Sequence, residues 1–205
     1  MRITKVLLSP PMALLFALLM IIGASCRESQ ARIPKPRAYP KVIFPARNYV
    51  QFDSASCPLR FTYPDYMKVE WRTEFFGQKP SNACWFDLDA QSLGAKIHWS
   101  YYPINEEMSL DRLVSDAFKI ADQINTRANY MDEIRVANKH GVSGLLMEFS
   151  GAAASPLHFY LTDSTSHFLK ASLYFQSKVV VDSLAPITDF LREDIAVIIN
   201  SMTFE

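Results

Sequence analysis

The feature that most constrains the fold is a set of three alternating segments between Val142 and Phe175. In each segment an apolar side chain occupies every second position, which is the repeat of a β-strand with one buried face. Breaks at 150–154 and 162–167 separate the segments. We predict an antiparallel meander whose apolar side chains share one face. The apolar residues are Leu145, Met147, Phe149, Leu157, Phe159, Leu161, Leu169, Ala171, Leu173 and Phe175. The residues predicted on the opposite face are Glu148, His158, Lys170 and Ser172.

The rest of the chain supplies further strands and two helices. Additional strands are predicted at 49–52, 59–63, 66–71, 84–88, 95–101 and 131–136. Apolar residues recur at helical spacing from Leu110 to about Arg127, with Ser109 as the expected N-cap, and again over 182–202. Strands, a helix, strands and a final helix predict an α+β domain, in which a twisted antiparallel sheet is covered by two helices. This single domain is predicted to span 49–205.

The strand that contains Phe61-Thr-Tyr-Pro64, together with the C-terminal helix, resembles the PsbP/Mog1-like sandwich. The resemblance implies a fold and no activity, because a shared fold hosts many unrelated functions.

The N-terminus has the layout of a secretory signal. Arg2 and Lys5 precede an apolar run from Val6 to Ile22, and Gly23-Ala-Ser leads to Cys26. Small residues directly before a cysteine predict a lipoprotein signal peptide at 1–25, with cleavage before Cys26 and acylation of that residue. The alternative is an uncleaved helical anchor, which the proline pair at positions 10 and 11 disfavours. Two or more acyl chains would hold the protein stably at a membrane.

Residues 26–48 are predicted to form a tether. Pro34, Pro36, Pro40 and Pro45 favour an extended path of up to ~60 Å for about 20 residues. The segment is basic, because six lysines and arginines are accompanied only by Glu28. It is either a strap for anionic headgroups or a partner protein, or an ordinary solvated linker.

Charge and cysteine content limit the remaining function classes. The formal net charge is +0, so nothing global favours nucleic acid. Once Cys26 is acylated, Cys57 and Cys84 remain as an even pair in an oxidising compartment, which predicts a disulfide, with two reduced thiols as the alternative.

No arrangement in the sequence reaches the standard of an active site. The four histidines have no metal-ligand spacing, so no metal and no cofactor are expected. Ser155, Asp163 and His167 could suggest a hydrolase, but no Gly-x-Ser-x-Gly turn is present and turn chemistry explains the Asp-Ser-Thr cluster. We therefore expect that the protein is not an enzyme.

Aromatic residues are the remaining candidates for contact with a partner. A surface patch could be formed by Trp85, Trp99, Tyr101, Tyr102 and Tyr174. Core packing is the alternative for each of them.

Several strings in the chain are similar to the gliding motility lipoprotein GldD family of the Bacteroidota. They are Lys35-Pro-Arg-Ala-Tyr39, 57–66, Cys84-Trp85, Ala153-Ala-Ser-Pro156, 159–165, His167-Phe-Leu169, Asp182-Ser-Leu-Ala-Pro186 and 190–194. The resemblance implies a role in gliding and the associated type 9 secretion machinery, and it supplies no catalytic residues.

The resulting hypothesis is a non-catalytic envelope lipoprotein. It would be anchored through Cys26, face the periplasm from either membrane, and dock onto gliding and secretion components. A periplasmic small-ligand-binding module is the alternative, and a small hydrolase comes third.

Overall fold

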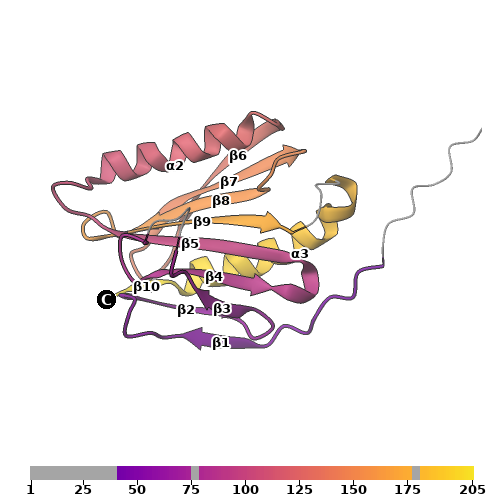
Figure 1. Cartoon of the computed structure of the whole chain (residues 1–205), viewed down its shortest axis with the longest axis horizontal. Helices are drawn as coiled ribbons and strands as arrows, with labels where there is room; N and C mark the ends of the chain where they lie inside the picture. Colours follow the sequence, from indigo (N-terminus) through magenta and orange to yellow (C-terminus); the bar gives the residue numbers. More distant parts are fainter. Residues whose placement is uncertain (1–40, 75–78, 177–180) are drawn as a thin grey trace, which may run out of the picture. The chain divides into compact units, whose positions relative to one another are not determined.

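The computed structural model describes residues 41–74, 79–176 and 181–205 (Figure 1). Its strands form two antiparallel sheets. The small sheet has the order β1-β2-β10, with strands β1 (Tyr49–Phe52), β2 (Leu59–Pro64) and β10 (Thr203–Phe204). The large sheet has the order β3-β4-β5-β9-β8-β7-β6. Its strands are β3 (Lys68–Trp71), β4 (Trp85–Ala90), β5 (Ala95–Pro103), β6 (Ala128–Ala137), β7 (Ser143–Gly151), β8 (Leu157–Thr162) and β9 (His167–Phe175).

Two α-helices complete the described part of the domain. Helix α2 (Leu110–Asn125) begins where predicted, because the Ser109 hydroxyl accepts a hydrogen bond from the backbone N–H of Arg112 at 3.4 Å. Its buried residues recur every three or four positions, so a single stripe faces the sheet. They are Leu113, Ala117, Ala121 and Ile124. Helix α3 (Val181–Ser201) follows the last strand of the meander, and a short 3₁₀ turn, η1 (Gln91–Leu93), links β4 to β5.

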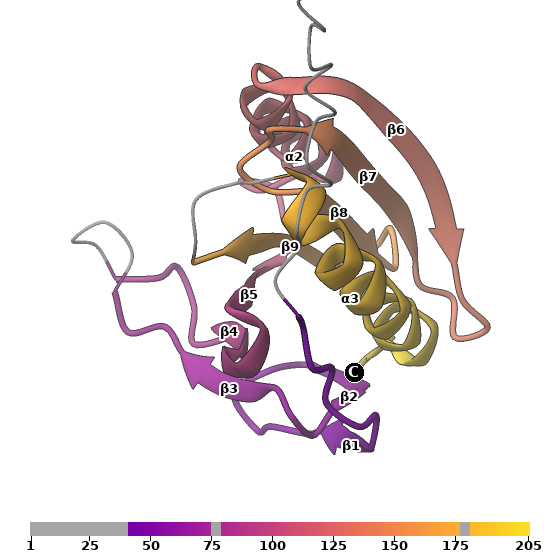
Figure 2. The same cartoon turned by 90° about the vertical axis from the view of Figure 1, so that its right-hand side faces the viewer.

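The large sheet has a layer on each side. Helix α2 packs on one side, which we call the outer face, and α3 with the small sheet packs on the other, the inner face (Figures 1 and 2). The main core lies at the inner face, where Phe61 of β2 and Trp99 of β5 stack with ring centroids 5.3 Å apart. Helix α3 adds Ile187, Leu191, Ile195 and Ile198 to this core.

The α+β class with two helices is confirmed, and the structure adds two details. Strands β1, β2 and β10 form a separate sheet, because β10 returns after α3 to pair with β2. The apolar residues of β7 also do not share the face of those in β8 and β9. Leu145, Met147 and Phe149 pack in a cluster with α2 at the outer face, while Phe159 and Ala171 belong to the inner core. A helix on the outer face gives that face its own apolar region, and β7 lies beneath it.

Candidate functional site

Four adjacent strands each contribute one polar side chain to a row across the outer face. The pairing register places Asp87 of β4 opposite His98 of β5, His98 opposite Ser172 of β9, and Ser172 opposite His158 of β8. Directly paired residues of antiparallel strands point to the same side of a sheet. The row is therefore fixed by register, although its members are far apart in sequence.

One end of the row is an ionic cluster. The Asp87 side chain is buried, with 4% of its surface exposed. Its Oδ1 accepts a hydrogen bond from His98 Nδ1 at 2.6 Å, and its Oδ2 accepts one from Arg72 Nε at 2.8 Å. Burial alone would raise the pKa of this carboxyl, but the hydrogen bonds from His98 and Arg72 outweigh burial and lower it. Asp87 is therefore ionised, and both of its carboxylate oxygens accept hydrogen bonds.

The other end of the row is a serine–histidine pair. The Ser172 hydroxyl lies 2.6 Å from Nδ1 of His158, whose side chain is 1% exposed. Burial lowers the pKa of His158 to about 4, and the positive charge of Lys170 acts in the same direction. The backbone carbonyls of Ala117 and Ala171 oppose this shift without reversing it. The imidazole is therefore neutral at pH 7.

A second row runs beside the first. The register places Trp85 of β4 opposite Ser100 of β5, Ser100 opposite Lys170 of β9, and Lys170 opposite Tyr160 of β8. The Lys170 ammonium lies 4.8 Å from the centre of the Tyr102 ring. Burial lowers the pKa of Lys170.

Between these rows and α2 lies a cavity of about 380 Å³, which we call the outer cleft. Its lining combines charged, polar, aromatic and aliphatic side chains. They include Arg72, Trp85, Asp87, His98, Ser100, Ile120, His158, Lys170, Ser172 and Tyr174. A pocket of this size with a few convergent polar groups is the usual form of a small-ligand site. Sequence alternation placed His158, Lys170 and Ser172 on one face, but Asp87 and His98 join them only through strand pairing.

A second cavity, of about 250 Å³, lies between α3 and strands β6 and β7. Its cation is already paired, because Arg192 Nε binds Glu148 at 2.8 Å and Arg192 Nη1 binds Asp189 at 2.6 Å. We therefore take the outer cleft as the candidate site.

The serine, aspartate and histidine considered from sequence do not meet. The Ser155 hydroxyl donates to the carbonyl of Leu157 at 2.9 Å. Asp163 Oδ1 accepts hydrogen bonds from the backbone N–H groups of Thr165, Ser166 and His167, a turn that lowers the pKa of Asp163 to about 2 against the effect of burial. Turn chemistry accounts for this cluster, as the sequence predicted.

The proposed aromatic surface is not present as such. Trp99 and Tyr101 face the inner core with 1% and 7% exposure, and Trp85 is 9% exposed at the outer cleft. Tyr102 and Tyr174 are half-buried on the outer face, where the Tyr174 ring lies 5.0 Å from that of His98. Alternation along β5 separates Trp99 and Tyr101 from Tyr102, so these rings cannot share one surface.

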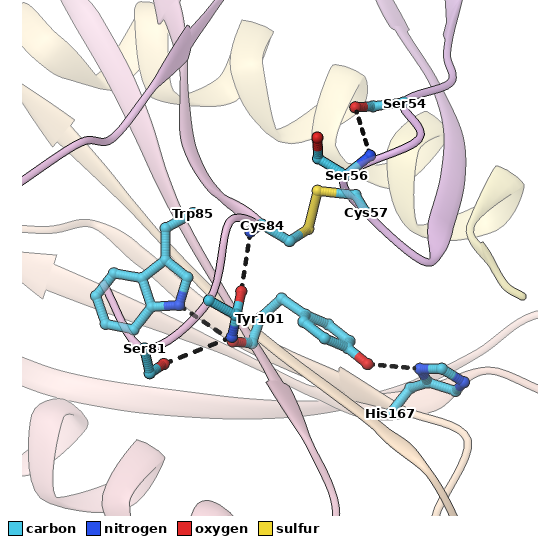
Figure 3. Close-up of a disulfide and its surroundings, with 9 residues drawn as sticks. Ser54, Ser56, Cys57, Ser81, Cys84, Trp85, Tyr101 and His167 are labelled. Carbon is cyan, nitrogen blue, oxygen red and sulfur yellow. Dashed lines mark hydrogen bonds between the residues drawn. A yellow bond between two sulfur atoms is a disulfide. The ribbon is translucent and has the colours of Figure 1, made fainter. Parts of the chain in front are cut away.

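The predicted disulfide joins Cys57 to Cys84 (Figure 3). It links the loop before β2 to the start of β4, and so connects the two sheets. Figure 3 also shows the Tyr101 hydroxyl directed at His167, whose Nδ1 lies 2.9 Å away. A loop closed over 27 residues stabilises the folded state by about 3.5 kcal/mol in the chain-entropy model.

The last residues of the predicted tether are held against α3. The Arg47 guanidinium lies 4.0 Å from the centre of the Phe190 ring, and its Nε lies 3.1 Å from Oδ1 of Asp194. Asp194 is fully buried and also accepts hydrogen bonds from the hydroxyls of Tyr49 and Tyr66. The segment from Lys41 to Asn48 is thus bound to the domain at its C-terminal end.

Cys26, the signal peptide and most of the tether lie outside the described residues. Within the described ranges, no helix has the length and apolar character needed to cross a bilayer. The same ranges hold no group of three or more His, Cys, Asp or Glu side chains placed to bind a metal ion.

Comparisons with known proteins place the chain in a family. A search of curated protein sequences found no match. A search of solved structures found the solution structure of cyanobacterial PsbP (CyanoP) from Synechocystis sp. PCC 6803, which is 9% identical, with 82% of this chain and 98% of that chain covered and a TM-score of 0.44. The family model described as gliding motility lipoprotein GldD matches residues 29–204, nearly the whole chain. The chain therefore belongs to the gliding motility lipoprotein GldD family.

Proposed function

We propose that this protein serves gliding motility and the associated type 9 secretion machinery by binding other envelope components, without catalysing a reaction. In this proposal acyl chains on Cys26 anchor it to a membrane, and its domain faces the periplasm. The observation that carries the proposal is the extent of the family match, which covers both the basic tether and the folded domain at residues 29–204.

The geometry of the serine–histidine pair supports a role without catalysis. A general base works best when its pKa is near the working pH, and the pKa of His158 is about 4. The carboxylate that could orient an imidazole, Asp87, is bound to His98 and Arg72 instead. Ser172 lies within β9 between two paired strands, so the backbone N–H groups around it belong to the sheet ladder and do not form an oxyanion hole.

The contact between the tether and α3 supports a role in positioning. Arg47 and Tyr49 meet the buried Asp194 directly after the proline-rich segment. In this proposal a pulling force on the lipid anchor would be transmitted to α3 through residues 41–49. The side of the domain that carries α3 would therefore be the side attached to the tether. Such an attachment suits a protein that acts by contact at a membrane.

The test is deletion of the gene in a gliding host, followed by complementation with the full-length wild type or with variants. We expect deletion to abolish colony spreading and export of type 9 cargo, and the wild type to restore both. Ser172→Ala should also restore both, because no chemistry at this hydroxyl is proposed. Cys26→Ala should restore neither, because its product stays unanchored or unprocessed.

Different outcomes of this experiment would contradict different parts of the proposed function. Normal spreading and export after deletion would refute the role in gliding and secretion. A Ser172→Ala protein that accumulates normally but restores nothing would refute the non-catalytic part. If the wild type never incorporates a labelled fatty acid, the anchor at Cys26 is wrong.

A further inference from the structure

Lys170 is a half-buried cation without a carboxylate partner. Among the described residues, none of the ion pairs within 4.0 Å includes Lys170. Asp116 of α2 raises the pKa of Lys170 from a distance, but its own Oδ1 lies 2.8 Å from Nζ of Lys119. Burial of a cation is costly unless it is paired, so this position favours an anion supplied from outside the chain.

Hydrogen-bond donors predominate among the polar groups of this cleft. Ser100 pairs with Lys170 across β5 and β9, and Arg72 and Tyr174 lie farther along the lining. The one carboxylate among the lining residues, Asp87, is already bound to Arg72 and His98. His158 is neutral, because burial lowers its pKa. The cleft thus carries a net positive charge, which suits an oxyanion.

Apolar side chains form the rest of the lining. Ile120 of α2 and Trp85 of β4 contribute to it, beside the Tyr174 ring. A cavity of about 380 Å³ accommodates a small organic molecule rather than a lone inorganic ion. We propose that the outer cleft binds a small carboxylate that has an aromatic or aliphatic body, with the carboxylate at Lys170 and the body against Trp85 and Ile120.

This site is distinct from the proposed role in secretion and is tested without any assay of gliding. The full-length chain is purified from membranes in a non-ionic detergent and titrated calorimetrically with phenylacetate, benzoate and hexanoate. Blank titrations into protein-free micelles correct for partitioning. We expect saturable binding of at least one of these carboxylates. The neutral isostere of phenylacetate, phenylacetamide, should bind about tenfold more weakly because it lacks the charge that meets Lys170.

Variants locate the site. Lys170→Met should weaken binding about tenfold, while Lys170→Arg should retain most of it because the charge is kept. Lys139→Met is the matched control, since Lys139 is exposed in the turn between β6 and β7 and outside the cleft. Circular dichroism melting confirms that each variant is folded.

Several results would overturn the proposal. They are the absence of saturable heat with all three carboxylates, equal affinity for phenylacetate and phenylacetamide, and an equal effect of Lys170→Met and Lys139→Met. If Lys170→Met does not fold, the comparison of Lys170→Arg with the amide isostere still decides the outcome.

Discussion

The two faces of the large sheet differ in how completely they are covered. The inner face meets both α3 and the small sheet, and its side chains form one continuous core. Among the described residues, α2 is the helix that covers the outer face, where it contacts β6, β7, β8 and β9. On β5, the next strand, the outward side chains stay half-buried. Those of β4 are buried.

The composition of each strand follows this difference in cover. Along β5, Trp99 points to the inner core, while its neighbours His98 and Ser100 line the outer cleft. Along β7, which lies beneath α2, the outer-facing residues are apolar instead. The outer cleft therefore lies at the margin of the region that α2 covers, and polar groups line it.

The largest expected effect is at the inner face. Trp99→Ala should lower the free energy of unfolding by about 4 kcal/mol, because it removes a large, fully buried ring and leaves a cavity. Urea unfolding followed by circular dichroism measures the change. Trp71→Ala is the control, since Trp71 is 45% exposed at the edge strand β3 and should cost clearly less. Equal losses for the two variants would contradict the assignment of the main core to the inner face.

The second prediction concerns acid pH at the outer face. The pKa of His158 is about 4 in the folded state and ~6.5 in the unfolded state. Between these two pH values the unfolded chain binds a proton at His158 and the folded chain does not. Stability from this group is fully present above pH ~6.5 and falls by about 3 kcal/mol as the pH decreases through 4. Urea unfolding between pH 7 and pH 4 should show this loss.

His158→Gln is the comparison for that experiment, because glutamine does not titrate. Its stability should fall less steeply with pH than that of the wild type, while carboxylates such as Asp87 titrate equally in both proteins. Parallel curves for the two proteins would show that His158 has an ordinary pKa and is not desolvated beneath α2.

Much of the fold could be predicted from local patterns. Period-two alternation located the meander, and apolar spacing with a capping serine at position 109 located α2. Both signals lie within one short segment. The even pair of cysteines likewise predicted the bridge between Cys57 and Cys84.

What could not be predicted depends on contacts between distant segments. Alternation shows that Leu145 and Phe159 each point to one side of a strand, but it does not show which layer that side meets. Here β7 and β8 pair so that these two residues face opposite layers. The outer cleft was missed for the same reason, since Asp87 and Ser172 come together only through the pairing of β4, β5 and β9.

The smallest expected effects come from two separate substitutions at neighbouring positions of β9. Ala171 is 2% exposed at the inner face, and Ser172 is 8% exposed at the outer face. Ala171→Ser should cost about 2 kcal/mol, because the new hydroxyl enters an apolar core where it has no partner. Ser172→Ala should cost about 1 kcal/mol, because it removes one hydrogen bond to His158 and adds no polar group to an apolar layer. Urea unfolding at pH 7 measures both. The order of the two costs carries the argument, because the residues are adjacent on one strand and face opposite sides of the sheet. A larger cost for Ser172→Ala would show that its hydrogen bond to His158 matters more to stability than an apolar side chain at position 171, and would contradict the contrast between the two faces.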